Sequence, residues 1–255
     1  MSERKGNIPE RLYQLKLPVG IEKDKKALVG RTTIELITAV VESFPEIQGI
    51  TLTSYIRGLY WDEGYVSREQ EIFWGVSKEE EYSRSDVQGE SFWQERLKKL
   101  KDIRIPKDSP FKVKEIEGWH TEEELESEVY VAFCSNVKTP YRVRHIPLLD
   151  FKCLISDIAL RRVTHLLRSF DWASWAVIIS GNSYQAFGLT LLNEETWDRW
   201  LNSLTLENNI KNWWLSNIDI VDQEFLKHSL KDRQSRLRLT TGMSKPTAPK
   251  VIAVI

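Results

Sequence analysis

The sequence predicts a mixed α/β fold of the α+β class, because strand-like and helix-like segments alternate along the chain without an internal repeat. Its 255 residues and 29.8 kDa are enough for one large domain or two small ones. The composition, 41% hydrophobic and 29% charged, is that of an ordinary globular protein rather than a disordered or fibrous one.

The apolar runs of the chain are too short to cross a bilayer, which takes roughly 20 apolar residues. Residues 1–14 are charged and lack the apolar region of a signal peptide. We therefore expect a cytoplasmic protein with no membrane partner. The two cysteines, Cys134 and Cys153, have no Cys-x-x-Cys or Cys/His spacing, so neither a zinc site nor a disulfide framework is expected.

The net charge is only −1, but it is unevenly distributed. Residues 1–137 carry 20 basic and 26 acidic side chains, whereas residues 138–255 carry 16 and 11. An anionic ligand would therefore meet the second half more favourably. A difference of this size also arises simply from the way solvated faces are composed, and the charge alone leaves both readings open.

In the first half, apolar spacing predicts a core helix over residues 32–44, which Pro45 ends. Residues rich in β-branched and aromatic side chains predict strands over 50–61, 71–76 and 129–134. A further helix is expected over 91–100, and Thr121 begins a capping box before a short helix. The glutamates between 122 and 128 are interpreted as a solvated helix face.

The second half alternates strands and helices more regularly. Strands are expected over residues 143–151, 175–179, 184–191, 218–221 and 236–240. Helices are expected over 155–170, over 194–204 with Asn193 as its cap, and from residue 222. The apolar side of the first helix should include Ile155 and Ile158, and the tryptophans of the second, Trp197 and Trp200, should be core residues.

Two acids follow apolar strands, Asp150 after Ile-Pro-Leu-Leu and Asp222 after Ile-Asp-Ile-Val. Between them lies a turn of small residues from Ser180 to Gln185, whose amides suit phosphate oxygens. Nucleotide polymerisation needs divalent cations held by such acids. An Asp after a strand is also a common turn or cap residue, so a structural role remains the alternative.

These motifs resemble those of the archaeo-eukaryotic primase superfamily, the primase-polymerases, and in particular its prokaryotic primase-like members. In that family a strand ends in Asp-x-Asp or Asp-x-Glu that binds metal, a later turn carries a His that contacts phosphates, and a third strand ends in another metal-binding Asp. The matching segments here are Asp150-Phe151-Lys152, the turn from Ser180 to Gln185, and Asp222, with Arg238 and Lys245 as basic residues after it.

The resemblance implies a primase-polymerase-like core with an RRM-like sheet over residues 129–255 and an N-terminal α/β lobe over 1–128, packed on that core. It also implies Mg²⁺ or Mn²⁺ held by Asp150 and Asp222, and a nucleotide or nucleic acid as the ligand. The residues expected at the nucleotide are Lys152, Ser180, Asn182, Ser183, Gln185, Arg238 and Lys245.

Two positions depart from the family pattern. Lys152 stands where the family has its second acid, and it brings a positive charge to a cation site. Gln185 stands where the family has His, and it can hydrogen-bond a phosphate but supplies neither charge nor proton. We therefore expect a primase-like nucleotidyltransferase fold whose polymerase chemistry is reduced or lost.

Two other readings remain. The chain could be a non-catalytic binding or assembly subunit, with a protein partner in a nucleic-acid-processing or defence complex. It could also be an interaction module with exposed aromatic side chains. The tryptophans expected on such a surface are Trp61, Trp74, Trp213 and Trp214.

Overall fold

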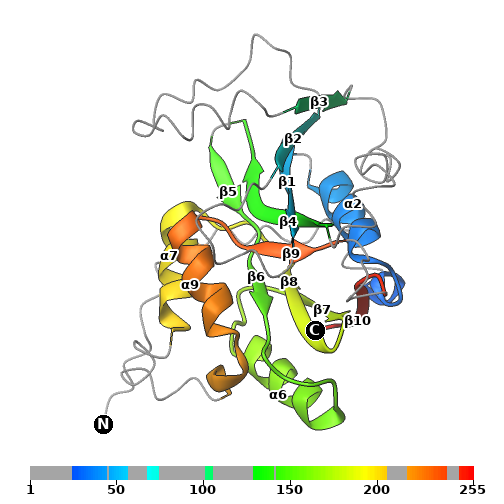
Figure 1. The fold of residues 1–255 in the computed structure, drawn as a ribbon, viewed down its shortest axis with the longest axis vertical. Coiled ribbons are helices and arrows are strands. Elements are labelled where there is room, and N and C mark those ends of the chain that lie inside the picture. Colours follow the sequence, from blue (N-terminus) through cyan, green and yellow to red (C-terminus); the bar gives the residue numbers. More distant parts are fainter. Residues whose placement is uncertain are drawn as a thin grey trace.

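The computed structural model describes about three fifths of the chain. The described residues are 25–44, 46–56, 68–74, 101–105, 129–140, 142–205, 217–239 and 247–255. They form two β-sheets with helices packed around them, so the predicted α+β class is confirmed (Figure 1).

The larger sheet has the strand order β3-β2-β1-β4-β5, and β9 also pairs with β4. All its pairs are antiparallel except β2 with β3. Its strands are β1 (Gly49–Ile56), β2 (Arg68–Trp74), β3 (Lys101–Ile105), β4 (Val129–Lys138), β5 (Val143–His145) and β9 (Arg236–Arg238).

The smaller sheet has the order β10-β7-β8-β6 and is antiparallel throughout. Its strands are β6 (Leu148–Asp150), β7 (Trp175–Ser180), β8 (Ser183–Gly188) and β10 (Lys250–Val254). The hairpin of β7 and β8 agrees with the sequence. The edge strand β10 was not predicted.

The helices begin at well-formed caps. Thr32 and Glu35 form a capping box at the start of α2 (Thr33–Ser43). Asn193 caps α7 (Glu194–Ser203), as the sequence predicts. Ser156 caps α6 (Asp157–Arg168), and this cap was not predicted. The remaining helices are α9 (Gln223–Asp232) and the short 3₁₀ segments η1 (Lys25–Leu28) and η3 (Ile218–Ile220).

Two apolar cores lie on opposite faces of the smaller sheet. The first contains residues of α2, β1 and β4 together with Leu148, Ile178 and Phe187 of the smaller sheet. The second contains residues of α6, α7, η3 and α9 together with Leu149 and Val177. Alternate residues of each strand therefore face alternate cores. The helices around the second core are α6 at the bottom of Figure 1 and the neighbouring α7 and α9.

The single strand predicted over residues 143–151 is wrong. The structure has two short strands there, β5 and β6, and they belong to different sheets. Pro147 lies between them and has no N–H to continue a ladder. Its carbonyl accepts a hydrogen bond from Gly188 at 2.7 Å, and the chain passes from one sheet to the other at this point.

Two further expectations need correction. Residues 218–221 form the 3₁₀ segment η3 and a single bridge between Val221 and Phe151, rather than a strand. Ile155 and Ile158 are exposed, whereas the buried side of α6 consists of Ala159, Val163, Leu166 and Leu167. Ile155 precedes the helix, and Ile158 lies on the outward side of α6, three residues before the exposed Arg161.

Several expectations fall outside the described residues. These are the helix over 91–100, the capping box at Thr121, the residues before 25, Lys245, and Trp61, Trp213 and Trp214. The division of the chain at residue 128 stays a prediction. Among the described helices, every one is too short or too polar to cross a bilayer.

Candidate functional site

Asp150 and Asp222 face each other across paired backbone segments. The N–H of Asp222 donates to the carbonyl of Asp150 at 2.9 Å, and the neighbouring residues Phe151 and Val221 form an antiparallel bridge. In such a bridge the residues that flank the pair are also opposed, and their side chains share one face. The fold therefore brings together two acids that are far apart in the sequence.

Gln185 extends this arrangement on the next strand. Its register places it directly opposite Asp150 in the pair of β6 and β8. Directly opposed residues have Cβ atoms about 5 Å apart on the same face of the sheet. Asp222, Asp150 and Gln185 thus form a line of oxygen-bearing side chains across three neighbouring segments, which we call the oxygen row.

The oxygen row lies on the face of the smaller sheet that looks toward the larger sheet. Leu148 and Phe187 have the same alternation as Asp150 and Gln185, and both belong to the first core. The two acids are half-buried, whereas Gln185 is only 4% exposed. Phe151, which has the opposite alternation, is packed into the second core.

The side-chain carbonyl oxygen of Gln185, Oε1, is buried without a hydrogen-bond partner. A buried amide oxygen normally has a partner, because leaving one unpaired costs about 1–3 kcal/mol. The orphaned oxygen belongs to Gln185, which stands opposite Asp150. This position is therefore one where a ligand or cation would satisfy an otherwise unpaired group.

Both carboxylates also accept hydrogen bonds from nearby backbone. The Oδ1 atom of Asp150 accepts from Phe151 N–H at 3.0 Å. The Oδ1 atom of Asp222 accepts from Glu224 N–H at 3.0 Å and from Phe225 N–H at 3.2 Å, which makes Asp222 the N-cap of α9. These bonds fix the orientation of the side chains, and each uses one oxygen of the carboxylate.

The turn between β7 and β8 follows the expected small-residue pattern. Gly181 has φ +66°, and Ser180 pairs with Ser183 across the turn, as in a hairpin with a glycine at the first central position. Ser183 Oγ donates to the carbonyl of Phe151. Asn182 is exposed at the tip, and its carbonyl accepts from Ile155 N–H at 3.2 Å. The turn is therefore fixed to the segment that follows Asp150.

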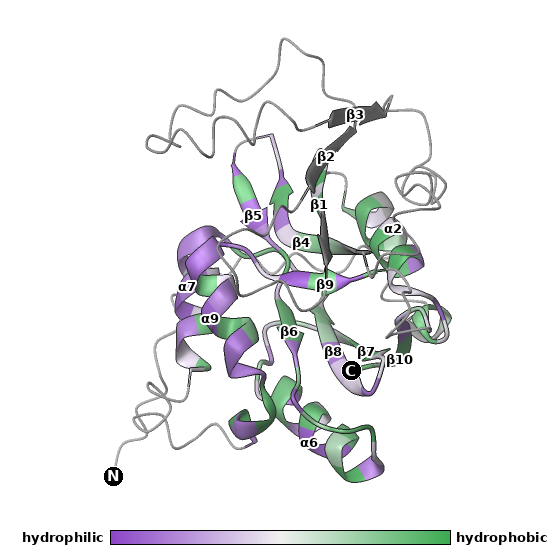
Figure 2. Cartoon of the chain, viewed as in Figure 1, coloured by the Kyte–Doolittle hydropathy of each residue, from purple (hydrophilic) through white to green (hydrophobic). Residues whose placement is uncertain are grey.

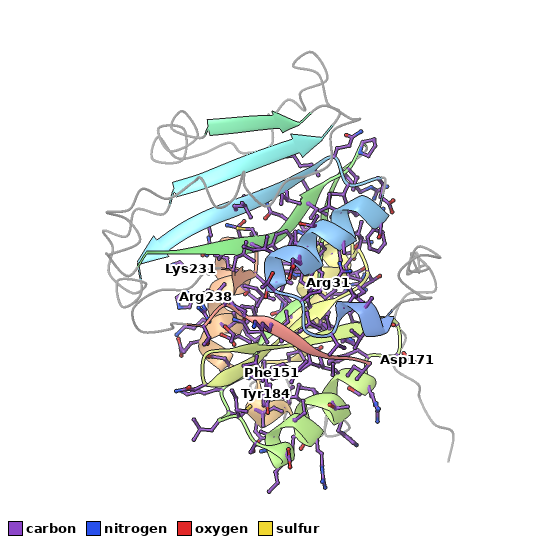
Figure 3. The ribbon with its side chains drawn as sticks, turned by 90° about the vertical axis from the view of Figure 1, so that its right-hand side faces the viewer. Arg31, Phe151, Asp171, Tyr184, Lys231 and Arg238 are labelled. Carbon is purple, nitrogen blue, oxygen red and sulfur yellow. The ribbon has the colours of Figure 1, made fainter. Side chains whose placement is uncertain are left out.

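Arg238 brings a buried positive charge to the same side of the smaller sheet. It is 2% exposed, and its Nε and Nη2 atoms lie 3.4 and 3.3 Å from Ser180 Oγ. Its Nη2 atom also donates to the carbonyl of Thr247 at 3.3 Å. In Figure 3, Arg238 lies above Phe151 and Tyr184, toward the larger sheet. Two of the predicted nucleotide residues, Ser180 and Arg238, are thus in contact with each other.

Lys152 lies just beyond Asp150 and is exposed. Its backbone N–H donates to the carbonyl of Ile220 at 2.8 Å, which extends the pairing beside Asp222. The residue that carries the ammonium group is therefore close to the oxygen row in the sequence, two residues after Asp150.

The residues present fit a hard divalent cation in part. Mg²⁺ and Mn²⁺ prefer carboxylate and amide oxygens, and the oxygen row offers two carboxylates and the unpaired Oε1 of Gln185. Within the described residues, no group of three or more His, Cys, Asp or Glu side chains could hold a metal ion. The donor set therefore suits a cation that takes further oxygens from a phosphate or from water.

Nucleophilic groups near this region are held inactive or are structural. Burial raises the pKa of the Cys153 thiol, so the thiol stays protonated at neutral pH. His145 Nδ1 lies 3.2 Å from Ser135 Oγ, but both residues are buried, and the imidazole is stacked on Trp197. Ser135 Oγ also accepts from Ser235 N–H at 2.9 Å. This Ser–His contact is a packing contact of the core.

The pattern of the sequence did not reveal the role of Tyr184. Its hydroxyl accepts from Ser156 N–H at 3.2 Å and donates to the carbonyl of Ser156 at 3.1 Å. Tyr184 lies beside Phe151, whose N–H donates to the Tyr184 carbonyl (Figure 3). The only signal in the sequence was a tyrosine next to the small-residue turn, and it carries no information about the partner of the hydroxyl.

The comparison with protein families gives one match. The sequence model of the family described as AEP-like, archaeo-eukaryotic primase 1D-like, matches residues 114–250, which is more than half of the chain. The matched region contains all three members of the oxygen row and Arg238. No curated protein and no solved structure matches the chain.

Proposed function

The chain belongs to the AEP-like family, archaeo-eukaryotic primase 1D-like, and on this premise we propose that it binds a nucleotide or nucleic acid at the oxygen row. It has a primase-like nucleotidyltransferase fold. One observation carries the proposal: the hydrogen bond from Asp222 N–H to the Asp150 carbonyl places two acids of distant motifs opposite each other. Residues brought together in this way suit shared binding of one charged ligand.

In this proposal Asp150 and Asp222 hold Mg²⁺ or Mn²⁺, and Gln185 contributes its unpaired Oε1 or contacts a phosphate. The cation, when bound, would neutralise phosphate charge and activate an attacking hydroxyl. The protein's own residues orient the ligand. The exposed Asn182 and the turn amides lie next to the row, and Arg238 adds a positive charge near Ser180.

We further propose that nucleotidyl transfer is reduced relative to binding. The row has two carboxylates where the family pattern has three acids, and Lys152 occupies the remaining position. A fixed positive charge beside a cation site weakens cation binding, because like charges repel. Nucleotidyl transfer needs every divalent cation in place. Binding of the nucleotide depends on the cations less, because amides and basic side chains can also bind its phosphates.

The proposal is tested by Mn²⁺ binding, followed by electron paramagnetic resonance, and by binding of a nucleoside triphosphate in the presence of Mn²⁺. Asp150→Asn should lower both affinities. Asp171→Asn is the matched control, because Asp171 is an exposed aspartate between α6 and β7. Absence of Mn²⁺ and nucleotide binding in the unaltered protein contradicts the proposal. Extension of a primed template with Mn²⁺ measures how much transfer remains.

A second candidate is a non-catalytic binding or assembly subunit of a nucleic-acid-processing or defence complex. The observation that favours it is Lys152 itself, together with the backbone hydrogen bonds that already engage Asp150 and Asp222. In that case nucleic-acid binding should persist in EDTA and fall steeply with salt. Binding that disappears in EDTA favours the cation-dependent function instead.

A further inference from the structure

Three large apolar side chains are exposed together just after the oxygen row. Leu154 is 78% exposed, Ile155 43% and Ile158 74%. They lie where the chain leaves β6 and enters α6, and this entry is green, the colour of hydrophobic residues, in Figure 2. Single exposed apolar residues are ordinary, whereas a contiguous group marks a contact surface.

This exposed segment is held in place by hydrogen bonds. Ile155 N–H donates to the carbonyl of Asn182, and Ser156 is bonded through its N–H and carbonyl to the hydroxyl of Tyr184. Ser156 Oγ also accepts from Ala159 N–H at 3.1 Å as the cap of α6. The apolar side chains are therefore presented on a fixed backbone, next to the turn of the candidate site.

Basic residues continue the same outward stripe along α6. From Ile158, spacings of three, four and three residues lead to Arg161, His165 and Arg168, and all four residues are exposed. Residues at this spacing lie on one side of a helix. The buried side chains of α6, including Val163 and Leu167, occupy the opposite side.

The stripe keeps a positive balance when its neighbours are included. Arg162, beside the stripe, is paired with Asp219, with Nη2 and Oδ2 2.6 Å apart, so this charge is neutralised. Asp157 in the first turn and Asp171 just after the helix are acidic and exposed. Arg161, Arg168 and the exposed Lys152 near Leu154 outnumber them.

We propose that Leu154, Ile158, Arg161 and Arg168 form a binding surface for a single nucleic-acid strand on the outward side of α6, across the smaller sheet from the oxygen row. The arginines contact phosphates, and the aliphatic side chains cover unpaired bases. Arg161 and Arg168 are about 10 Å apart along the helix, so they contact different phosphates of the strand. The proposal rests on the proposed function, because that function makes a nucleic acid the ligand of this protein.

The chemistry of the surface favours a strand over other occupants. A partner protein would need acidic side chains placed opposite both arginines, whereas a strand offers phosphates and bases along its whole length. An anionic membrane surface shares the phosphate chemistry, so the test includes it as a separate arm.

The test measures binding of a fluorescent oligothymidine to the full chain in EDTA and without nucleotide, over a range of salt concentrations. Arg161→Gln with Arg168→Gln should reduce the slope of log K against log salt by about 1.4, since each phosphate contact on a single strand contributes about 0.7. The matched control is Lys231→Gln with Lys250→Gln, which removes two exposed cations from α9 and β10. The control should leave the slope unchanged.

Leu154→Ser with Ile158→Ser should weaken oligothymidine binding several-fold at an unchanged salt slope, and should not affect an abasic strand of the same length. Equal effects of the stripe and control variants overturn the proposal, as does a wild-type chain that does not bind the strand. If the stripe variants lose binding to phosphatidylcholine–phosphatidylserine vesicles but still bind the strand, the proposal is wrong and the stripe binds a lipid surface instead.

The outcomes for this surface and for the oxygen row are separable. Strand binding that survives in EDTA and in Asp150→Asn, while Mn²⁺ and nucleotide binding fail in every form, supports the α6 surface and contradicts the proposed function. If the unaltered chain binds Mn²⁺ and nucleotide, and the stripe variants bind the strand as tightly as the unaltered chain, the proposed function is supported and the α6 surface is contradicted. Thermal unfolding of each variant confirms that these exposed substitutions leave the fold intact.

Discussion

The backbone N–H of Asp222 donates to the carbonyl of Asp150, and the two residues lie opposite each other beside the bridge between Phe151 and Val221. This relationship gives Asp222 two roles. Its carboxylate caps α9 through Oδ1, and it is one of two acids facing the same side of the smaller sheet. A loss of ligand binding on substitution could therefore come from either role.

Asparagine and alanine at position 222 separate the two roles. Asn is as good an N-cap as Asp, whereas Ala removes the cap at a cost of about 1 kcal/mol. We expect Asp222→Asn to unfold at nearly the wild-type urea concentration but to bind Mn²⁺ weakly. Asp222→Ala should lose both Mn²⁺ affinity and stability. Mn²⁺ binding by Asp222→Asn equal to that of the unaltered protein would contradict a role for this carboxylate in holding the cation.

Lys152→Glu is expected to strengthen cation binding. The substitution replaces a positive charge with an acid two residues after Asp150, so the Mn²⁺ affinity should rise on the order of tenfold. Titration calorimetry with Mn²⁺ measures the change. Lys227→Glu on α9 is the matched control, because Lys227 is also exposed and the change in net charge is the same. An equal rise in both variants would show a general effect of net charge and no local site.

Local patterns in the sequence predicted most of the second half. Apolar spacing and cap residues located α7, and small residues located the hairpin of β7 and β8. The pattern failed at residues 143–151, because an apolar run does not show which sheet each part joins. Pro147 was the available signal for the break between β5 and β6.

The candidate site was predictable in its members but not in its geometry. The position of Asp150 after an apolar run was visible, whereas its pairing with Asp222 depends on a single bridge between distant residues. The contact of Arg238 with Ser180 joins the two sheets, and no local spacing encodes it. The exposure of Ile158 was mispredicted because helical spacing alone does not show where the buried side begins.

His145 should make stability depend on pH in the acidic range. Burial lowers the pKa of His145 to about 4 from its ordinary value of 6.5, so the folded protein keeps the imidazole neutral. The contribution of His145 to the free energy of unfolding is fully present above pH 6.5. It is lost as the pH falls from 6.5 toward 4, because in this range the imidazole takes up a proton in the unfolded chain but not in the folded one. The difference between the two pKa values corresponds to about 3 kcal/mol of unfolding free energy.

Urea unfolding at several pH values between 7 and 4 measures this dependence, and His145→Phe is the informative variant. Phenylalanine retains an aromatic ring against Trp197 and does not titrate. Its unfolding free energy should fall less between pH 7 and 4 than that of the unaltered chain. Burial also lowers the pKa of His228, so a smaller dependence in the same direction should remain. Identical pH profiles for both proteins would contradict the assignment to His145.

Tyr184→Phe should loosen the entry to α6 without altering the sheet. The substitution removes the hydroxyl that bonds both the N–H and the carbonyl of Ser156, and the loss should cost about 1 kcal/mol, the typical net value of a hydrogen bond. Hydrogen exchange at the Ser156 amide should accelerate, while amides of β7 keep their protection.

Ser169→Ala is the control, because Ser169 Oγ donates to the carbonyl of Leu166 at the other end of the same helix. Since Leu154 and Ile158 lie on either side of Ser156, oligothymidine binding should weaken in Tyr184→Phe and not in Ser169→Ala. Equal weakening in the two variants would attribute the effect to the stability of α6 as a whole rather than to the fixed position of its entry.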